Sequence, residues 1–270
     1  MRLTRRGALI LTTVFPLCEA EGAQPGQPGG VLWQGWSGGY QWTWSRTNLS
    51  VRPPRPLEPW TFREKSQPKP DDLDGLTTLE TRISPLSLVG SVVSVRKDEY
   101  WDGGAHPSGW ISYLSYDADR PEAPLRLTDL FPESDVLRAL WADAIVQKAL
   151  RGAGVKEPPR TAAELEEKLA PLTFTGPRGV EYSFSKKFLS EFSFHHLEGN
   201  QVAVRLCAPW GIEVYRFQST EIGILLPIPA SRRTAFQNAA RGKEGYLTRN
   251  LPPALKGKSA KLVEYSRPRR

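Results

Sequence analysis

The chain has few of the residues that most often cross-link a fold or carry its chemistry. Its 270 residues include two cysteines, one methionine and three histidines. Cys18 falls in an N-terminal segment that we expect to be removed, and Cys207 alone cannot form an internal disulfide. Beyond that segment, no apolar run approaches the roughly twenty residues that a membrane span needs. We therefore expect the hydrophobic core to hold the fold unaided, with Cys207 as a small buried side chain rather than a nucleophile.

The first 20 residues have the pattern of an export signal. Arg2, Arg5 and Arg6 precede the apolar run GALILTTVFPL, which has the length of a signal-peptide core and is too short to span a bilayer. Cleavage after Ala20 would leave small residues at the cut, and TRRGALIL loosely resembles a twin-arginine signal. The large residues before Cys18 disfavour a lipid anchor. We expect a periplasmic or secreted protein, with a merely hydrophobic N-terminus as the alternative.

The net charge of +7 is concentrated at the C-terminus. Residues 241–270 hold nine Lys or Arg against two Glu, and residues 1–20 hold three Arg against one Glu, so the body between them carries a net charge of −2. A nearly neutral body does not favour a specific nucleic-acid partner. We expect residues 241–270 to form a flexible basic tail that could touch anionic lipid or polymer. A solvated tail without a dedicated partner is the alternative.

The 24 prolines and 23 glycines predict many turns and few long helices. Residues 21–30, EGAQPGQPGG, are expected to form a flexible lead. Residues 31–79 begin with aromatic residues, among them Trp42 and Trp44, that alternate with polar ones, and continue into a proline-rich stretch. We expect strands followed by an extended arm, and a possible N-terminal subdomain. Core packing is the preferred role of the tryptophans, and a sugar-stacking platform is the alternative.

Residues 80–240 combine strand and helix patterns. The β-branched run PLSLVGSVVSVRKDEYW and the alternating run WISYLSYDA flank GGAHPSG, which predicts two strands joined by a short connection. A helical period extends from an N-cap at Ser134 to Gly152, and a capping box of Thr161 and Glu164 begins a second helix. Strand patterns follow. We therefore expect an α+β fold, with a mainly antiparallel sheet and one or two helices packed on one face.

Three segments together resemble a known family. They are GGAHP at Gly103–Pro107, LTDLF at Leu127–Phe131 and EIGILLPIP at Glu221–Pro229. Over residues 80–236 the chain resembles the exported domain of unknown function 3298. That RsiV-like domain occurs in the extracellular part of a lysozyme-sensing anti-sigma factor and as an accessory domain in a peptidoglycan deacetylase. The resemblance implies an α+β domain with helices on one side of the sheet, and its motifs are more specific for fold than for activity.

The better-known relatives differ from this chain in two respects. An anti-sigma role needs a transmembrane helix, and the sequence shows none. A deacetylase domain would carry a paired-Asp strand motif or a His-x-x-x-His helix motif for a metal, and neither is recognisable in the sequence. We therefore expect neither activity.

The segment DEYWDGGAHPSG, residues 98–109, holds the candidate site residues. In one interpretation Asp102 and His106 act as a general acid and base. In another, Gly103 and Gly104 supply the backbone freedom for a tight turn, and His106 bonds to the backbone. A binding loop is the third. No Ser or Cys lies in a recognisable nucleophile elbow, so the structural turn is preferred, followed by the binding loop and then by catalysis.

A zinc site built from His106, His195 and His196 is a further interpretation, since three imidazoles suit a hydrolytic metal. Neighbouring residues on a strand point to opposite faces of the sheet. We therefore expect His195 and His196 to be unable to bind one ion together, and we expect no metal and no cofactor.

We expect an exported, non-catalytic binding module of the cell envelope that recognises a lysozyme-like protein or a wall glycan such as a peptidoglycan fragment. Two tryptophans would serve as aromatic anchors. The expected binding residues are Trp101, Asp102, Gly103, Gly104, His106 and Trp110. The alternative is a hydrolase or deacylase that acts on wall glycan with Asp102 and His106.

Overall fold

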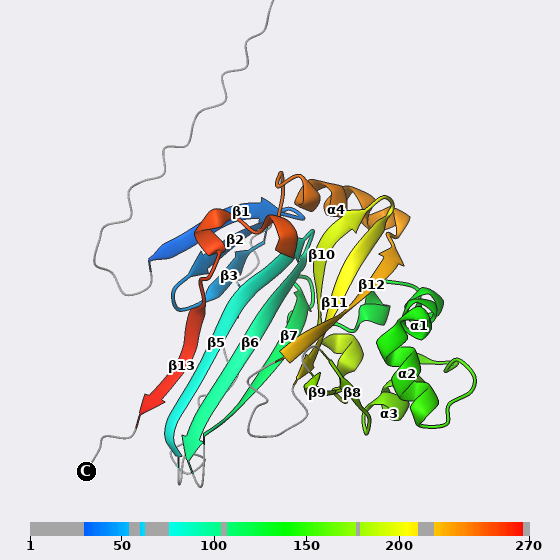
Figure 1. Cartoon of the computed structure of the whole chain (residues 1–270). Coiled ribbons are helices and arrows are strands. Elements are labelled where there is room, and N and C mark those ends of the chain that lie inside the picture. The colour runs from blue at the N-terminus through cyan, green and yellow to red at the C-terminus, as the bar shows by residue number, and fades with distance from the viewer. Residues whose placement is uncertain are drawn as a thin grey trace, which may run out of the picture.

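The protein is described here from a computed structural model, which covers residues 30–53, 60–62, 76–103, 107–176, 179–209 and 219–266. It has the expected α+β architecture, with antiparallel sheets and four helices in the described ranges (Figure 1). The four helices exceed the one or two that the sequence predicts. None of the described helices is both long and apolar enough to cross a membrane.

Two sheets form one half of the molecule. The first has the order β1-β2-β3-β4 and contains β1 (Val31–Ser37), β2 (Tyr40–Ser45), β3 (Leu49–Arg52) and β4 (Trp60–Phe62). The second has the order β13-β5-β6-β7 and contains β5 (Leu76–Val89), β6 (Val92–Gly103), β7 (Ser108–Asp117) and β13 (Ala260–Ser266).

A shared core joins these two sheets. Trp42 and Trp44 are at most 1% exposed and pack with Leu88, Val93 and Val95 of the long sheet. Burial of two large rings contributes several kcal/mol, at about 25 cal/mol per Å² of apolar surface. The alternation of β2 therefore marks a core face, as preferred from the sequence.

The other half is a three-stranded sheet covered by helices. Its order is β10-β11-β12, with β10 (Phe192–Glu198), β11 (Gln201–Pro209) and β12 (Ser219–Pro227). Helices α1 (Glu133–Ala142), α2 (Ala144–Gly152), α3 (Ala162–Leu169) and α4 (Arg233–Ala240) complete this half. A short hairpin of β8 (Thr173–Thr175) and β9 (Glu181–Ser183) lies beside α2 and α3 (Figure 1).

The helix-covered face follows from the period of the strands. Val202, Val204 and Leu206 of β11 alternate into the larger core, where they are fully buried among side chains of the helices. Residues between them point to the opposite face. This opposite face carries most of the polar side chains considered below.

The two halves meet through a few buried polar contacts. Ser115 on β7 donates to the carbonyl of Phe192 at 2.8 Å, and the amide of Phe194 donates to the hydroxyl of Ser87 at 3.2 Å. Backbone groups at the edge of one sheet are thereby satisfied by side chains of the other. We infer that β10 is held firmly against the long sheet.

The predicted single helix from Ser134 to Gly152 is wrong in two details. The first helix begins at Glu133 after Pro132, so Ser134 lies inside it. Asp143 then interrupts the run, because its extended backbone ends α1 and its carboxylate accepts from the amides of Ile145 and Val146, both at 3.0 Å. An aspartate that caps a new helix is favoured over continuing the old one.

The second predicted helix is confirmed. The hydroxyl of Thr161 accepts from the amide of Glu164 at 3.1 Å at the start of α3. The Glu164 carboxylate reaches back to the amide of Arg160 rather than that of Thr161. These bonds satisfy amides that the first helical turn leaves without partners.

The prediction of a flexible tail from residue 241 is wrong for residues 241–266. Tyr246 is fully buried and exchanges two backbone hydrogen bonds with Leu88, at 2.7 and 2.8 Å. Its hydroxyl accepts from the indole of Trp44 at 3.1 Å. The described part of this segment ends with β13, which pairs with β5. Apolar residues lie between the Lys and Arg residues and pack this segment against the core. The net charge of the segment does not show this pattern.

The predicted boundary near residue 79 also lies inside an element. β5 runs from Leu76 to Val89 across it, and the N-terminal sheet shares its core with the long sheet. In the proline-rich stretch, the described part is β4, which pairs with β3. The predicted export signal and most of the flexible lead lie outside the described residues.

Candidate functional site

The paired strands β6 and β7 confirm the predicted strand pair around GGAHPSG. Their register runs from Val92 opposite Asp117 to Trp101 opposite Ser108. Gly104 and His106 lie outside the described residues. The interpretations of the turn, and of an acid and base pair with His106, therefore stay predictions.

The two tryptophans predicted as anchors lie on one face of the long sheet. Trp101 pairs with Ser108, and Trp110 is two residues further along β7, opposite Glu99. Cross-strand partners share a face, and so do residues two apart on a strand. Both tryptophans are partly exposed. They are diagonal neighbours, close enough for both rings to contact one partner.

This aromatic surface lies where the long sheet extends away from the helices, at the end of β6 (Figure 1). Leu79 on β5 pairs with Trp101 and extends the apolar strip. Lys97 and Glu99 form an ion pair at 3.0 Å on the same face. We call Leu79, Trp101 and Trp110 the tryptophan strip.

Asp102 does not belong to this strip. It follows Trp101 on a regular part of β6, so its side chain is directed to the opposite face, the face of Tyr100 and Asp98. Of the predicted binding residues, the structure thus brings together Trp101 and Trp110 and separates Asp102 from them. Gly103 ends β6.

The prediction that His195 and His196 point to opposite faces is wrong. The register of β10 against β11 shifts between Phe194, which pairs with Val204, and His196, which pairs with Ala203. His195 is the extra residue of this β-bulge, and a bulge breaks the simple alternation of a strand. The two Nδ1 atoms lie 2.8 Å apart, as donor and acceptor.

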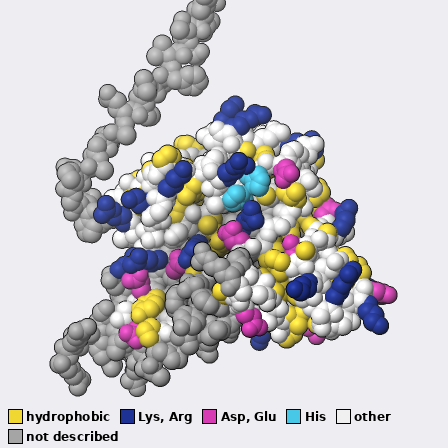
Figure 2. All heavy atoms as spheres, viewed as in Figure 1, with side chains coloured by type: hydrophobic (Ala, Val, Ile, Leu, Met, Phe, Trp, Pro, Cys, Tyr) yellow, Lys and Arg dark blue, Asp and Glu magenta, His cyan; other side chains and the backbone are white. Residues whose placement is uncertain are grey.

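The environment of His195 is cationic. Partial burial lowers its pKa first, and the charges of Arg205, His196 and Arg249 lower it further, while Glu221 opposes them. Figure 2 shows the two imidazoles on the surface, with Lys or Arg side chains beside them. In the described ranges, no three His, Cys, Asp or Glu side chains form a group that could hold a metal ion.

A second polar contact joins the long sheet to the three-stranded sheet, on the face of the three-stranded sheet that lies opposite the helices. The hydroxyl of Tyr113 on β7 donates to Oε1 of Glu221 on β12 at 2.5 Å. Arg96, the cross-strand partner of Tyr113, donates from Nε to Asp98 at 2.8 Å. Burial, followed by the charge of Glu221, raises the pKa of Tyr113. The phenol is therefore a hydrogen-bond donor that fixes Glu221.

Two buried groups have shifted pKa values without exposure to a ligand. The thiol of Cys207 is fully buried, and burial raises its pKa above the usual range. This confirms Cys207 as a buried side chain. Glu191 is 7% exposed, and burial raises its pKa to about 7. Its Oε1 accepts from the hydroxyl of Ser185 at 2.9 Å, while Oε2 is buried with no partner in the described structure.

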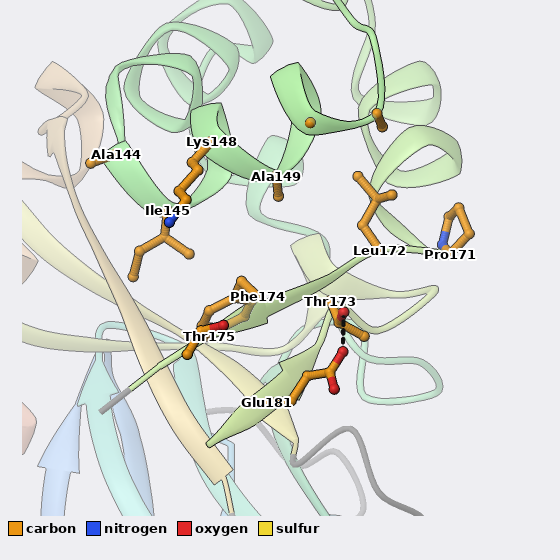
Figure 3. Close-up of a pocket in the computed structure, with 12 residues that line it drawn as sticks. Ala144, Ile145, Lys148, Ala149, Pro171, Leu172, Thr173, Phe174, Thr175 and Glu181 are labelled. Carbon is orange, nitrogen blue, oxygen red and sulfur yellow. Dashed lines mark hydrogen bonds between the residues drawn. The ribbon is translucent and has the colours of Figure 1, made fainter. Parts of the chain in front are cut away.

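A pocket of about 610 Å³ lies between α2 and the β8–β9 hairpin (Figure 3). Ile145 and Phe174 form part of its apolar lining, and the amine of Lys148 lies near them. Across the hairpin, the hydroxyl of Thr173 donates to the carboxylate of Glu181 at 2.5 Å. The volume is within the range of ligand pockets. Its lining holds one cation, Lys148, and one anion, Glu181.

The sequence did not indicate the basic side chains around the histidine pair or the pocket beside α2. A bulge is set by strand register, which one sequence does not display. The two adjacent histidines within an alternating run were the one feature of the sequence that could have indicated the bulge. No family model, curated protein or solved structure matches this chain.

Proposed function

We propose that the protein is an exported, non-catalytic binding module of the cell envelope, which recognises a lysozyme-like protein or a wall glycan through the tryptophan strip. The observation that carries the proposal is the placement of Trp101 and Trp110 as diagonal neighbours on one face, at an end of the sheet remote from the helices (Figure 1). Export is supported by the sequence of residues 1–20.

The chemistry of the strip suits such a partner. Indole rings offer large, rigid and partly apolar surfaces that stack on sugar faces or fill shallow pockets of a protein. The Lys97–Glu99 ion pair beside them supplies hydrogen-bonding groups at the rim. The long sheet provides a rigid base, because the strip is built on paired strands rather than on a loop.

The test measures binding of the mature protein to c-type lysozyme and to soluble peptidoglycan fragments by titration calorimetry. We expect a micromolar dissociation constant for one of them, and a loss of at least about tenfold in Trp101→Ala and in Trp110→Ala, since a buried aromatic anchor contributes more than about 1.4 kcal/mol.

Trp36→Ala is the matched control, because Trp36 is 56% exposed on β1 in the other sheet. It should bind as the wild type does. Far-ultraviolet circular dichroism and the melting temperature establish that each variant is folded. Absence of binding to either ligand, or equal losses in Trp36→Ala and Trp101→Ala, would contradict the proposal.

A further inference from the structure

A basic cluster lies on the face of the three-stranded sheet opposite the helices, apart from the tryptophan strip. It consists of His195 and His196 on β10, Arg205 on β11, and Arg249 on the 3-10 helix η7 (Thr248–Asn250). We call these four residues the basic cluster. Arg205 is placed on this face because Val204 and Leu206, its neighbours on β11, are buried on the helix side.

A glycine on the neighbouring strand leaves room for the side chain of Arg205. Gly223 is its cross-strand partner on β12. A Cβ atom at Gly223 would overlap Nη1 of Arg205 and lie 3.1 Å from its Cζ. The guanidinium therefore lies directly over Gly223, in space that any other residue would fill.

One donor of the Arg205 guanidinium is unsatisfied within the described ranges. Its Nε is buried and has no acceptor in the described structure. An unsatisfied buried donor costs about 1–3 kcal/mol. Within the described ranges, no carboxylate forms an ion pair with either Arg205 or Arg249. The acid that acts on the pKa of His195 is Glu221, which already accepts a hydrogen bond from Tyr113.

Thr248, the residue before Arg249, holds the 3-10 helix η7 against β10. The hydroxyl of Thr248 lies 2.9 Å from the carbonyl oxygen of Leu86 and 3.1 Å from that of Phe194. These contacts fix η7 against β10 immediately before the bulge. Both histidines are partly exposed, and Figure 2 shows them at the surface with basic side chains beside them and an acidic side chain nearby, so a ligand can reach them from this side.

We propose that His195, His196, Arg205 and Arg249 form a binding site for a phosphate group. Two guanidinium groups would repel a metal cation, and they match the oxygen geometry of a phosphate. A phosphate also offers more acceptor oxygens than a carboxylate to donors that come from three separate elements. The phosphate could be free in solution or part of a lipid headgroup. The proposal does not depend on the function of the tryptophan strip.

The chain offers a sensitive probe, because it has three histidines. Imidazole carbon–hydrogen signals of the mature protein are followed by nuclear magnetic resonance during titration with inorganic phosphate, with chloride added to hold ionic strength constant. Spectra of His195→Gln and His196→Gln assign the signals. We expect saturable shifts of the His195 and His196 signals, and none for His106.

Two variants test the arginine in different ways. Arg205→Gln removes the charge, and Gly223→Ala keeps it but displaces the guanidinium. Each should weaken phosphate binding by about tenfold or more, the loss expected for a charge-assisted contact. Arg52→Gln, an exposed arginine on β3, is the control and should bind as the wild type does. A saturable shift that is unchanged in both test variants would overturn the proposal.

A sedimentation assay separates the two sources of phosphate. Vesicles of phosphatidylcholine with phosphatidylglycerol are compared with vesicles of phosphatidylcholine alone. Binding to the anionic vesicles that is lost in Arg205→Gln and kept in Arg52→Gln assigns the site to lipid headgroups. Saturable binding of inorganic phosphate without such vesicle binding assigns it to a soluble phosphate. Failure of the titration and the vesicle assay together would overturn the site while leaving the tryptophan strip untouched.

Discussion

Replacing Glu191 by glutamine should make the stability of this protein less dependent on pH. The carboxyl group is 7% exposed, has one hydrogen bond from Ser185, and leaves Oε2 without a partner in the described structure. Burial raises its pKa from 4.5 to about 7, although the hydrogen bond from Ser185 and the charge of Lys187 act in the opposite direction. The folded state therefore holds the proton more tightly than the unfolded chain.

The sign of the effect follows from this difference. Because the folded pKa is above the unfolded value, the contribution of Glu191 to stability is complete below about pH 4.5 and is lost as the pH rises through 7. Each pKa unit corresponds to about 1.4 kcal/mol, so between pH 5 and pH 9 the free energy of unfolding should fall by roughly 2–3 kcal/mol on account of this group. Glutamine carries no charge at any of these pH values, and the effect should vanish.

The assay is urea unfolding at pH 5, 7 and 9, followed by tryptophan fluorescence, for the wild type and Glu191→Gln. The difference between the two proteins should change by roughly 2–3 kcal/mol across this range, in favour of the variant at high pH. Glu198→Gln, an exposed site at the end of β10, the strand that follows Glu191, controls for the loss of one negative charge. If Glu191→Gln and the wild type show the same pH dependence, the buried carboxyl is not the cause and the reasoning is refuted.

Two further predictions concern the core. Gly245→Ala should lower the free energy of unfolding by about 3 kcal/mol or more, because φ is +72° and a Cβ atom there would overlap the carbonyl oxygen of Leu88. Gly257→Ala is the control: φ is +66° and the space around it is open, so the free energy of unfolding should fall by only about 1–2 kcal/mol. Similar losses in both glycine variants would contradict this. The thiol of Cys207 should react with a thiol reagent only after unfolding, because it is buried and its pKa is raised; rapid modification of the native protein would contradict its placement.

The sequence predicted the elements whose signals are local. The alternation around Trp42 and Trp44 indicated a core strand, and the hydroxyl of Thr161 marked the start of α3 correctly. Period and capping depend on residues a few positions apart, so they can be read without knowing the partners of an element. Asp143 was such a signal and was overlooked within a longer helical run.

Features that depend on distant partners could not be read in this way. The C-terminal segment has a basic composition, yet Tyr246 lies in a core with Trp44 of β2, 202 residues earlier in the chain. The bulge at His195 depends on the register between β10 and β11. Arg205 has its place because the partner residue on β12 is Gly223. Each of these needs strand pairing, which no single segment contains.

The candidate sites likewise include residues that local sequence patterns indicated and residues that only strand pairing brings together. Trp101 and Trp110 were predicted as anchors, and the register of β6 and β7 confirms that they share a face. Asp102 was predicted as a binding residue on the assumption that it lies in a loop. It lies instead near the end of β6, where the alternation of the strand directs its side chain to the other face. The basic cluster joins residues from β10, β11 and η7, and composition alone placed the positive charge in a tail.

Hydrogen–deuterium exchange of the mature protein, with and without a saturating lysozyme-like or glycan ligand, tests the proposed binding surface most directly. We predict that the ligand slows exchange in residues 97–103 and 107–112, the strands that carry the tryptophan strip, and leaves helices α1 to α3 unchanged. Protection confined to the helices or the β8–β9 hairpin, or no protection at any ligand concentration, would contradict the account.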